Sequence, residues 1–181
     1  ARHAMVTLST STSLASIPGI VHGFTSRVGG VSLAPKDSLH LGFQDGVAPE
    51  ELLENYTRAV HALHPTLSVG DVAVVNQVHG NKVQFVDRPA GPLDALGSAD
   101  ALIALGPSTV LLVRIADCVP VLLATSDGRA IGAVHSGWWG TASAVVRHAV
   151  RALRLRAPDS PSIVAAIGPH VSLNAYEVSE E

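Results

Sequence analysis

The segment Val119–His135, VPVLLATSDGRAIGAVH, decides the fold. Two apolar runs, Val119–Ala124 and Ile131–His135, flank the tripeptide Ser126-Asp127-Gly128, which is typical of a tight turn. Apolar runs of this length are short for a helix and are typical of strands. We therefore predict a β-hairpin with His135 at the end of its second strand.

Further strands and two helices are predicted around this hairpin. One helix begins at Pro49 and ends before Pro65, and its apolar residues form one stripe. A second runs from about Thr141, the predicted N-cap, to Leu155. Hairpins combined with two helices indicate an α+β fold, with mixed β-sheets and the helices packed outside. The additional predicted strands are Val72–Val75, Val83–Val86, Val110–Ile115 and Ser162–Ile167.

Composition narrows the class of protein. The chain has 181 residues, 47% of them hydrophobic, and a net charge of −3, which fits a single domain with its own core. This charge balance argues against nucleic acid as a partner. No apolar run approaches the roughly 20 residues that a membrane span needs.

The termini and the cysteine content lead to three further expectations. The single cysteine, Cys118, rules out an internal disulfide and favours a reducing compartment, so we expect a cytoplasmic protein. The start of the chain lacks a long apolar stretch, so no signal peptide is expected. Ala1–Ala4, which precede Met5, read as vector-derived, and residues 5–181 as a single catalytic domain.

Three residues that can bind a metal follow apolar runs at predicted strand ends: His79, Cys118 and His135. Gly80 and Gly137 allow the chain to turn away directly after the two histidines. Strands of one sheet could bring all three to a common edge. Two imidazoles and a thiolate suit zinc, and three protein ligands leave the fourth position open, as in catalytic zinc sites. Spacing alone leaves an alternative, because a lone histidine or cysteine beside a strand is commonly a packed core residue.

Ordered blocks along the chain resemble a known family. They resemble the purine nucleoside phosphorylases of the laccase-domain family, formerly called multicopper polyphenol oxidases. The similarity runs from about residue 20 to the C-terminus, and several blocks in the same order are far more specific than any one of them. The blocks are HGFTSRVGGVS at residues 22–32, SLHLG at 38–42, QVHG at 77–80, ADAL at 99–102, ADCVP at 116–120 and HSGW at 135–138.

This resemblance implies a fold, a metal and a reaction. The fold would be an α/β/β/α arrangement similar to the catalytic domain of cytotoxic necrotizing factors. The ligands His79, Cys118 and His135 would hold zinc, with copper as the alternative metal. The reaction would be phosphorolysis of adenosine, inosine, guanosine or methylthioadenosine, with adenosine deamination as a further activity. The expected partners are a nucleoside and inorganic phosphate, with neither nucleic acid nor membrane, and the chain would be a monomer or weak homodimer.

Other residues are candidates for substrate binding and proton transfer. Arg27, beside two glycines, offers phosphate a bidentate guanidinium, although it could equally be an ordinary surface arginine. His40 is expected to line the pocket. Asp117 could orient a ligand or move a proton, or only cap a turn. Cys118 and His135 are catalytic candidates as well as ligands. The helix that follows His135 would present its N-terminal amides to an anion.

The chain departs from the family pattern in three places. Trp139 stands where a basic residue is usual, so its indole either stacks on the purine or leaves a weakened phosphate site. His170 stands where a cysteine is usual. Relatives also normally extend well past Tyr176, so we expect the C-terminal part of the domain to be missing.

Four alternative functions remain open. A polyphenol oxidase would need several coppers and paired His-X-His motifs, which this sequence does not supply. A cysteine hydrolase would use Cys118 as nucleophile and His135 as base. Some members of the family are assigned to peptidoglycan precursor editing. An inactive nucleoside-binding domain is the fourth alternative, favoured by Trp139 and His170.

Overall fold

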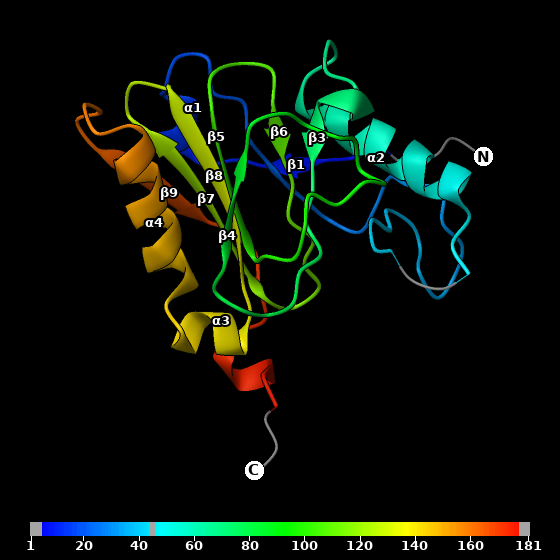
Figure 1. Cartoon of the computed structure of the whole chain (residues 1–181). Helices are drawn as coiled ribbons and strands as arrows, with labels where there is room; N and C mark the ends of the chain where they lie inside the picture. Colours follow the sequence, from blue (N-terminus) through cyan, green and yellow to red (C-terminus); the bar gives the residue numbers. More distant parts are fainter. Residues whose placement is uncertain (1–4, 44–45, 178–181) are drawn as a thin grey trace.

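The computed structural model describes residues 5–43 and 46–177 (Figure 1). The predicted vector-derived residues Ala1–Ala4 lie outside this range. Among the described residues, no helix combines the length and apolar character needed to cross a membrane.

Five strands form a mixed sheet in the order β4-β5-β8-β7-β9 (Figure 1). β4 and β5 are parallel, and all other neighbours are antiparallel. The predicted hairpin is confirmed, because β7 pairs with β8 through a turn in which Gly128 has φ 72°. The strands are β4 Val83–Val86, β5 Ala101–Leu105, β7 Val119–Thr125, β8 Ala130–Ser136 and β9 Ile163–Ile167.

Two short strand pairs complete the β-structure. β3 (Val72–Ala73) runs parallel to β6 (Val110–Leu111), and β1 (Leu8–Ser9) runs antiparallel to β2 (Phe24–Thr25). The strands predicted over 72–75 and 110–115 are therefore shorter than expected. β5 was not predicted as a strand, because it is buried on both faces and lacks the alternation that reveals a half-exposed strand.

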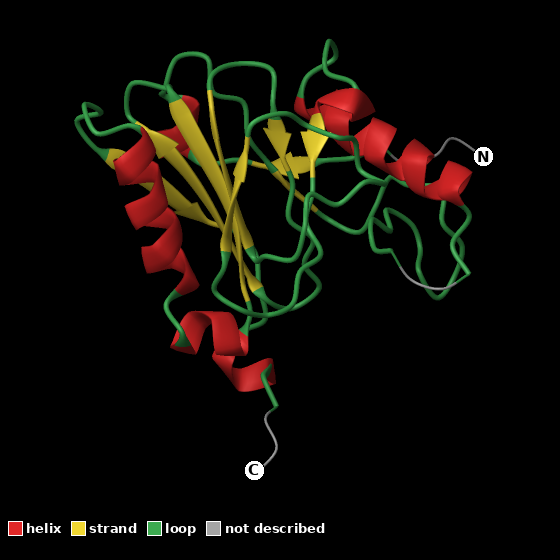
Figure 2. Cartoon of the chain, viewed as in Figure 1, coloured by secondary structure: helices red, strands yellow, loops and turns green. Residues whose placement is uncertain are grey.

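Two helices, α4 and α2, cover the two outer faces of the β-structure (Figures 1 and 2). α4 (Val145–Arg156) packs Ala149 and Leu153 against one face of the five-stranded sheet. α2 (Pro49–Leu63) packs Tyr56 onto the β3–β6 pair on the far side. A shorter helix, α1 (Thr12–Ala15), contacts β9. The α+β class is confirmed, and the layers agree with the expected α/β/β/α arrangement.

The second predicted helix is in fact two helices. α3 (Trp138–Ala142) and α4 are separated by Ala144, whose φ of 63° is left-handed and ends the helical hydrogen-bond ladder. Thr141 is consequently not the N-cap of a long helix. It lies within α3, and its hydroxyl donates to the carbonyl of Gly137. Gly137 is the N-cap of α3. No glycine or proline marks the break, so the sequence offered no signal for it.

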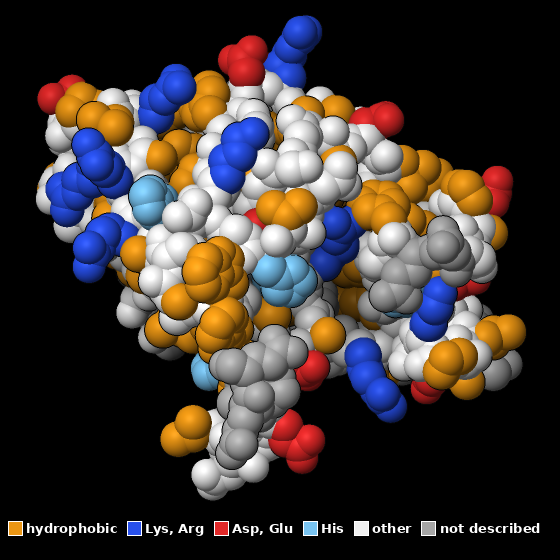
Figure 3. Space-filling view, turned by 60° about the horizontal axis from the view of Figure 1, so that its bottom comes forward, with side chains coloured by type: hydrophobic (Ala, Val, Ile, Leu, Met, Phe, Trp, Pro, Cys, Tyr) orange, Lys and Arg blue, Asp and Glu red, His pale blue; other side chains and the backbone are white. Residues whose placement is uncertain are grey.

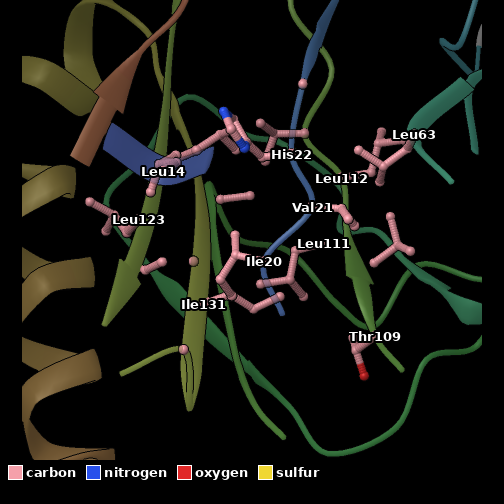
Figure 4. Close-up of a pocket in the computed structure, with 18 of the residues that line it drawn as sticks. Leu14, Ile20, Val21, His22, Leu63, Thr109, Leu111, Leu112, Leu123 and Ile131 are labelled. Carbon is pink, nitrogen blue, oxygen red and sulfur yellow. The ribbon is translucent and has the colours of Figure 1, made fainter. Parts of the chain in front are cut away.

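An apolar cavity of about 930 Å³ lies between the five-stranded sheet and the β3–β6 pair (Figure 4). Leu14, Ile20, Leu111 and Ile131 belong to its wall, and His22 is one of its polar residues. None of the three predicted metal ligands lines it. The cavity and the predicted metal site are therefore separate features of the molecule.

Candidate metal centre

Sheet register brings the three predicted ligands to one end of the five-stranded sheet. His135 lies near the end of β8, opposite Pro120 of β7, and Cys118 directly precedes β7. His79 comes shortly before β4, which starts at this same end because Val83 pairs with Ala101 of β5. The ligand atoms of the three residues all lie within 4.8 Å of one another. They form a group that could hold one metal ion.

Gly137 lies between the three side chains. A Cβ built on this residue would lie 2.8 Å from Cδ2 of His79, 3.4 Å from Sγ of Cys118 and 3.6 Å from Cε1 of His135. Its backbone, with φ −72°, is open to any residue, so the close approach is what requires glycine. The three ligands thus surround a point that the chain leaves free of any side chain.

His79 is exposed and adopts a left-handed backbone conformation, with φ 59°. Such a conformation is uncommon for a non-glycine residue and needs support from its surroundings. The backbone N–H of His79 donates to Oδ1 of Asp100 at 2.9 Å, and that of Gly80 donates to Oδ2 at 2.7 Å. The ring of His79 lies edge-on to that of His135, with centroids 4.8 Å apart.

Asp100 also contacts the buried ligand. Its side chain is fully buried, and Oδ1 lies 2.8 Å from Nδ1 of His135. Engagement of Nδ1 leaves Nε2 of His135 for a metal. The sequence predicts Asp117 to orient a ligand, to move a proton or to cap a turn. Asp117 is instead exposed, and its carboxylate makes no hydrogen bond to another described residue.

Burial and charge around Cys118 favour its role as a metal ligand over a role as a free nucleophile. Burial raises the pKa of the Cys118 thiol, and the charges of Asp117 and Asp100 raise it further. Burial lowers the pKa of His135, opposed by its contact with Asp100. The thiolate is the reactive form of cysteine, so this setting opposes the hydrolase alternative, whereas a bound cation would stabilise the thiolate.

Two tryptophans lie immediately beyond the ligands. Trp138 and Trp139 begin α3 and are 61% and 59% exposed, with ring centroids 5.8 Å apart. Figure 3 looks onto the end of the molecule that carries α3, where hydrophobic and histidine side chains lie side by side. The helix predicted to present its amides to an anion is only five residues long, which limits its dipole.

Arg27 and His40 belong to a loop that is anchored on α2. Buried Asn55 accepts a hydrogen bond from the Val31 N–H and donates one to the His40 carbonyl. The backbone carbonyl of Arg27 accepts from the Ser38 N–H at 2.8 Å, while its side chain is exposed. Among the described residues, no hydrogen bond or ion pair links the side chain of either predicted substrate residue to the metal ligands.

Neither His40 nor His170 belongs to the group of three candidate ligands. Nε2 of His40 is buried and has no hydrogen-bond partner among the described residues, and burial lowers the pKa of this histidine. Nδ1 of His170 lies 2.8 Å from the carbonyl of Gly168 in its own segment. That segment is held beside the metal ligands, because the Val171 N–H donates to the Asp117 carbonyl.

Fold and site together define an α+β domain with a His-Cys-His group suited to a metal. Residues 21–181 match the family described as multi-copper polyphenol oxidoreductase laccase, and the chain belongs to this family. The resemblance predicted from the sequence blocks is thereby confirmed.

Similar proteins that are named for an enzymatic activity are purine nucleoside phosphorylases. The chain is 39% identical over 168 residues to purine nucleoside phosphorylase ORF3 of Streptomyces griseus, covering 92% of this chain and 68% of that protein. It is 35% identical over 162 residues to a purine nucleoside phosphorylase of Deinococcus radiodurans, covering 90% and 61%. The chain thus spans about two thirds of the length of these relatives.

Solved structures agree with the fold. The crystal structure of YlmD from Geobacillus stearothermophilus matches with a TM-score of 0.81 and 30% identity, over 92% of this chain and 62% of that one. The hypothetical protein YfiH of Bacillus licheniformis matches with a TM-score of 0.76 and 28% identity, over 85% and 60%.

Proposed function

We propose that this chain belongs to a zinc-dependent purine nucleoside phosphorylase. The observation that carries the proposal is the grouping of His79, Cys118 and His135 within 4.8 Å, around a glycine that leaves the space between them free. Relatives 35–39% identical to this chain are named purine nucleoside phosphorylases, which supports the choice of reaction.

Zinc fits the donor set. Two imidazoles and one thiolate form a borderline-soft site, and three protein ligands leave one position open. When bound, zinc would supply a Lewis acid at that open position. A polyphenol oxidase with several coppers would need further ligand groups, and the described part of the chain holds this one alone.

The proposed reaction breaks the glycosidic bond of a purine nucleoside. A phosphate oxygen attacks C1′, the bond from C1′ to N9 breaks, and its electron pair leaves with the purine, which takes up a proton. The products are ribose 1-phosphate and the free base. The protein must position phosphate and stabilise the departing base, because the transition state resembles an oxocarbenium ion.

The chain's own residues are assigned parts in this reaction. Arg27 would bind phosphate, since its side chain is exposed on a loop whose backbone is held in place. Trp139, exposed where relatives usually carry a basic residue, would border the substrate without a charge for phosphate, so turnover would be slow. His40 would line the substrate pocket, and Asp117, exposed beside Cys118, would move the proton that the purine needs at N7. We also propose a cytoplasmic location and a monomer or weak homodimer.

A phosphate-dependence assay tests the proposal. Purified protein is incubated with adenosine, with and without inorganic phosphate, and the products are separated by chromatography. Phosphorolysis yields adenine and ribose 1-phosphate only when phosphate is present. Inosine formed without phosphate would indicate adenosine deamination, the second activity we propose. Absence of any product would contradict both and leave a nucleoside-binding domain.

A further inference from the structure

We propose that Asp100 is a positioning residue that sets the tautomer of His135 and holds the backbone of His79, so that the metal centre is formed before metal binds. The inference rests on the metal centre of the proposed function but not on its reaction. It assigns to one buried carboxylate the alignment of two ligands that come from different strands.

Asp100 is connected to both ligand segments by the atoms of its side chain. Oδ1 accepts from the His79 N–H at 2.9 Å and lies 2.8 Å from Nδ1 of His135. Oδ2 accepts from the N–H groups of Val78 and Gly80, at 3.2 and 2.7 Å. Both oxygens are therefore fully engaged, and every contact is to a segment that carries a ligand.

The backbone of Asp100 strengthens this link. Its carbonyl accepts from the His135 N–H at 2.8 Å, and its own N–H donates to the Lys82 carbonyl at 3.0 Å. It directly precedes β5, which pairs with β4 on one side and β8 on the other. A residue so placed cannot shift without disturbing the register of the sheet, so its carboxylate is a fixed reference point.

The contact with His135 determines which ring nitrogen carries a proton. A carboxylate accepts hydrogen bonds but cannot donate, so the neutral imidazole must place its proton on Nδ1. Nε2 then keeps its lone pair, which a metal requires. Without this contact the ring could adopt the other tautomer, in which Nε2 carries a proton and cannot coordinate.

The same carboxylate supports the strained ligand. His79 keeps its left-handed φ of 59° while three successive N–H groups, of residues 78–80, converge on Asp100. Exposed His79 is otherwise held by few contacts, because its side chain makes no hydrogen bond to a described residue. The position of its ring therefore depends on the backbone that Asp100 fixes.

The charge of Asp100 is not balanced by a cationic side chain among the described residues. The one titratable side chain in contact with its carboxylate there is the neutral imidazole of His135, and no lysine or arginine side chain reaches it. A fully buried carboxylate is costly unless a positive charge compensates it. A metal bound at Nε2 of His135 would bring that positive charge to the far side of the same ring. The arrangement thus suits a cation site better than a purely structural hydrogen-bond network.

The test compares Asp100→Asn with Asp117→Asn. Both variants remove one carboxylate charge near Cys118, but only the first removes contacts to the ligand segments. Zinc affinity is measured on metal-free protein by competition with a chromophoric chelator. For Asp100→Asn we expect roughly 10- to 100-fold weaker zinc binding, and for Asp117→Asn binding close to that of the wild type. Equal zinc affinity for Asp100→Asn and the wild type would overturn the proposal.

The tautomer of His135 gives a second readout that needs no folded Asp100 variant. Nitrogen-15 spectra of the metal-free wild type, assigned by comparison with His135→Gln, should show the proton on Nδ1. A proton on Nε2 in the wild type would contradict the proposal even if Asp100→Asn fails to fold. If the wild type binds zinc and carries the proton on Nδ1 of His135 but catalyses no phosphorolysis, only the proposed reaction is contradicted. The two proposals can therefore fail separately.

Discussion

A Cβ at Gly137 would lie 2.8 Å from Cδ2 of His79. Gly137→Ala should therefore displace the His79 ring from the ligand group. Overpacking of this kind costs about 1–3 kcal/mol, so we expect zinc binding to weaken about fivefold to a hundredfold. The matched control is Gly80→Ala, whose added Cβ would meet no atom closer than 3.6 Å. Equal zinc affinities for the two variants would show that the approach at Gly137 is unimportant.

Metal content is the most direct test of the centre. Elemental analysis of protein never exposed to a chelator should find about one zinc per chain. His79→Ala should lose most of this zinc, because it removes one of three ligands, while His148→Ala, which changes an exposed histidine of α4, should retain it. Several coppers per chain would instead support the polyphenol oxidase alternative.

Arg27→Ala should act on phosphate and not on the nucleoside. The backbone carbonyl of Arg27 is held by the N–H groups of Ser38 and Leu39, so the loop should survive loss of the exposed side chain. A charge-assisted hydrogen bond contributes about 1.5–3 kcal/mol, so the KM for phosphate should rise roughly tenfold or more. Steady-state kinetics in each substrate measure this, with Arg147→Ala as a surface control. Parallel increases in both KM values would mean that Arg27 only holds the loop.

Trp139→Arg should raise phosphorolysis and leave zinc content unchanged. The indole of Trp139 is 59% exposed at the start of α3, where an arginine could reach phosphate without repacking the core. A restored charge-assisted contact of about 1.5–3 kcal/mol corresponds to roughly a tenfold to hundredfold gain. Trp138→Arg, at an equally exposed neighbouring position, is the control. A fall in activity would instead assign Trp139 to packing or to stacking on the purine.

His22 makes stability depend on pH. Its Nε2 accepts from the Ser11 N–H at 2.7 Å, and burial lowers its pKa below the ordinary value of 6.5. Because the folded state disfavours the protonated form, the contribution of His22 is fully present above pH 6.5. It is lost as the pH falls through the lower pKa of the folded state.

Urea unfolding of the wild type and His22→Gln checks this expectation. Between about pH 7.5 and pH 5 the wild type should lose more stability than the variant, because a neutral glutamine accepts the same hydrogen bond at every pH. The difference between the two proteins isolates His22 from His40 and His135, whose pKa values are also lowered by burial. Identical pH profiles would rule out a contribution from this residue.

Elements governed by local chemistry were predictable. α2 begins at Pro49 as expected, because proline suits the first helical turn and the apolar stripe follows the helical period. The β7–β8 hairpin and β4 were also found where alternating or continuous apolar runs met turn residues. The ordered blocks around His79, Cys118 and His135 were sufficient to predict the family. These signals depend on residues that are close neighbours in the chain.

Tertiary structure alone decided how the site is assembled. Asp100 lies 21 residues from His79 and 35 from His135, and only the pairing of β5 between β4 and β8 brings its carboxylate to both. The break at Ala144 likewise has no local signal, because alanine has the highest intrinsic preference for a continuous helix. Local periodicity determines which residues form a strand, but register between distant strands determines which side chains meet. For that reason the three candidate ligands could be named from the sequence, while the contacts that join Asp100 to their segments could not.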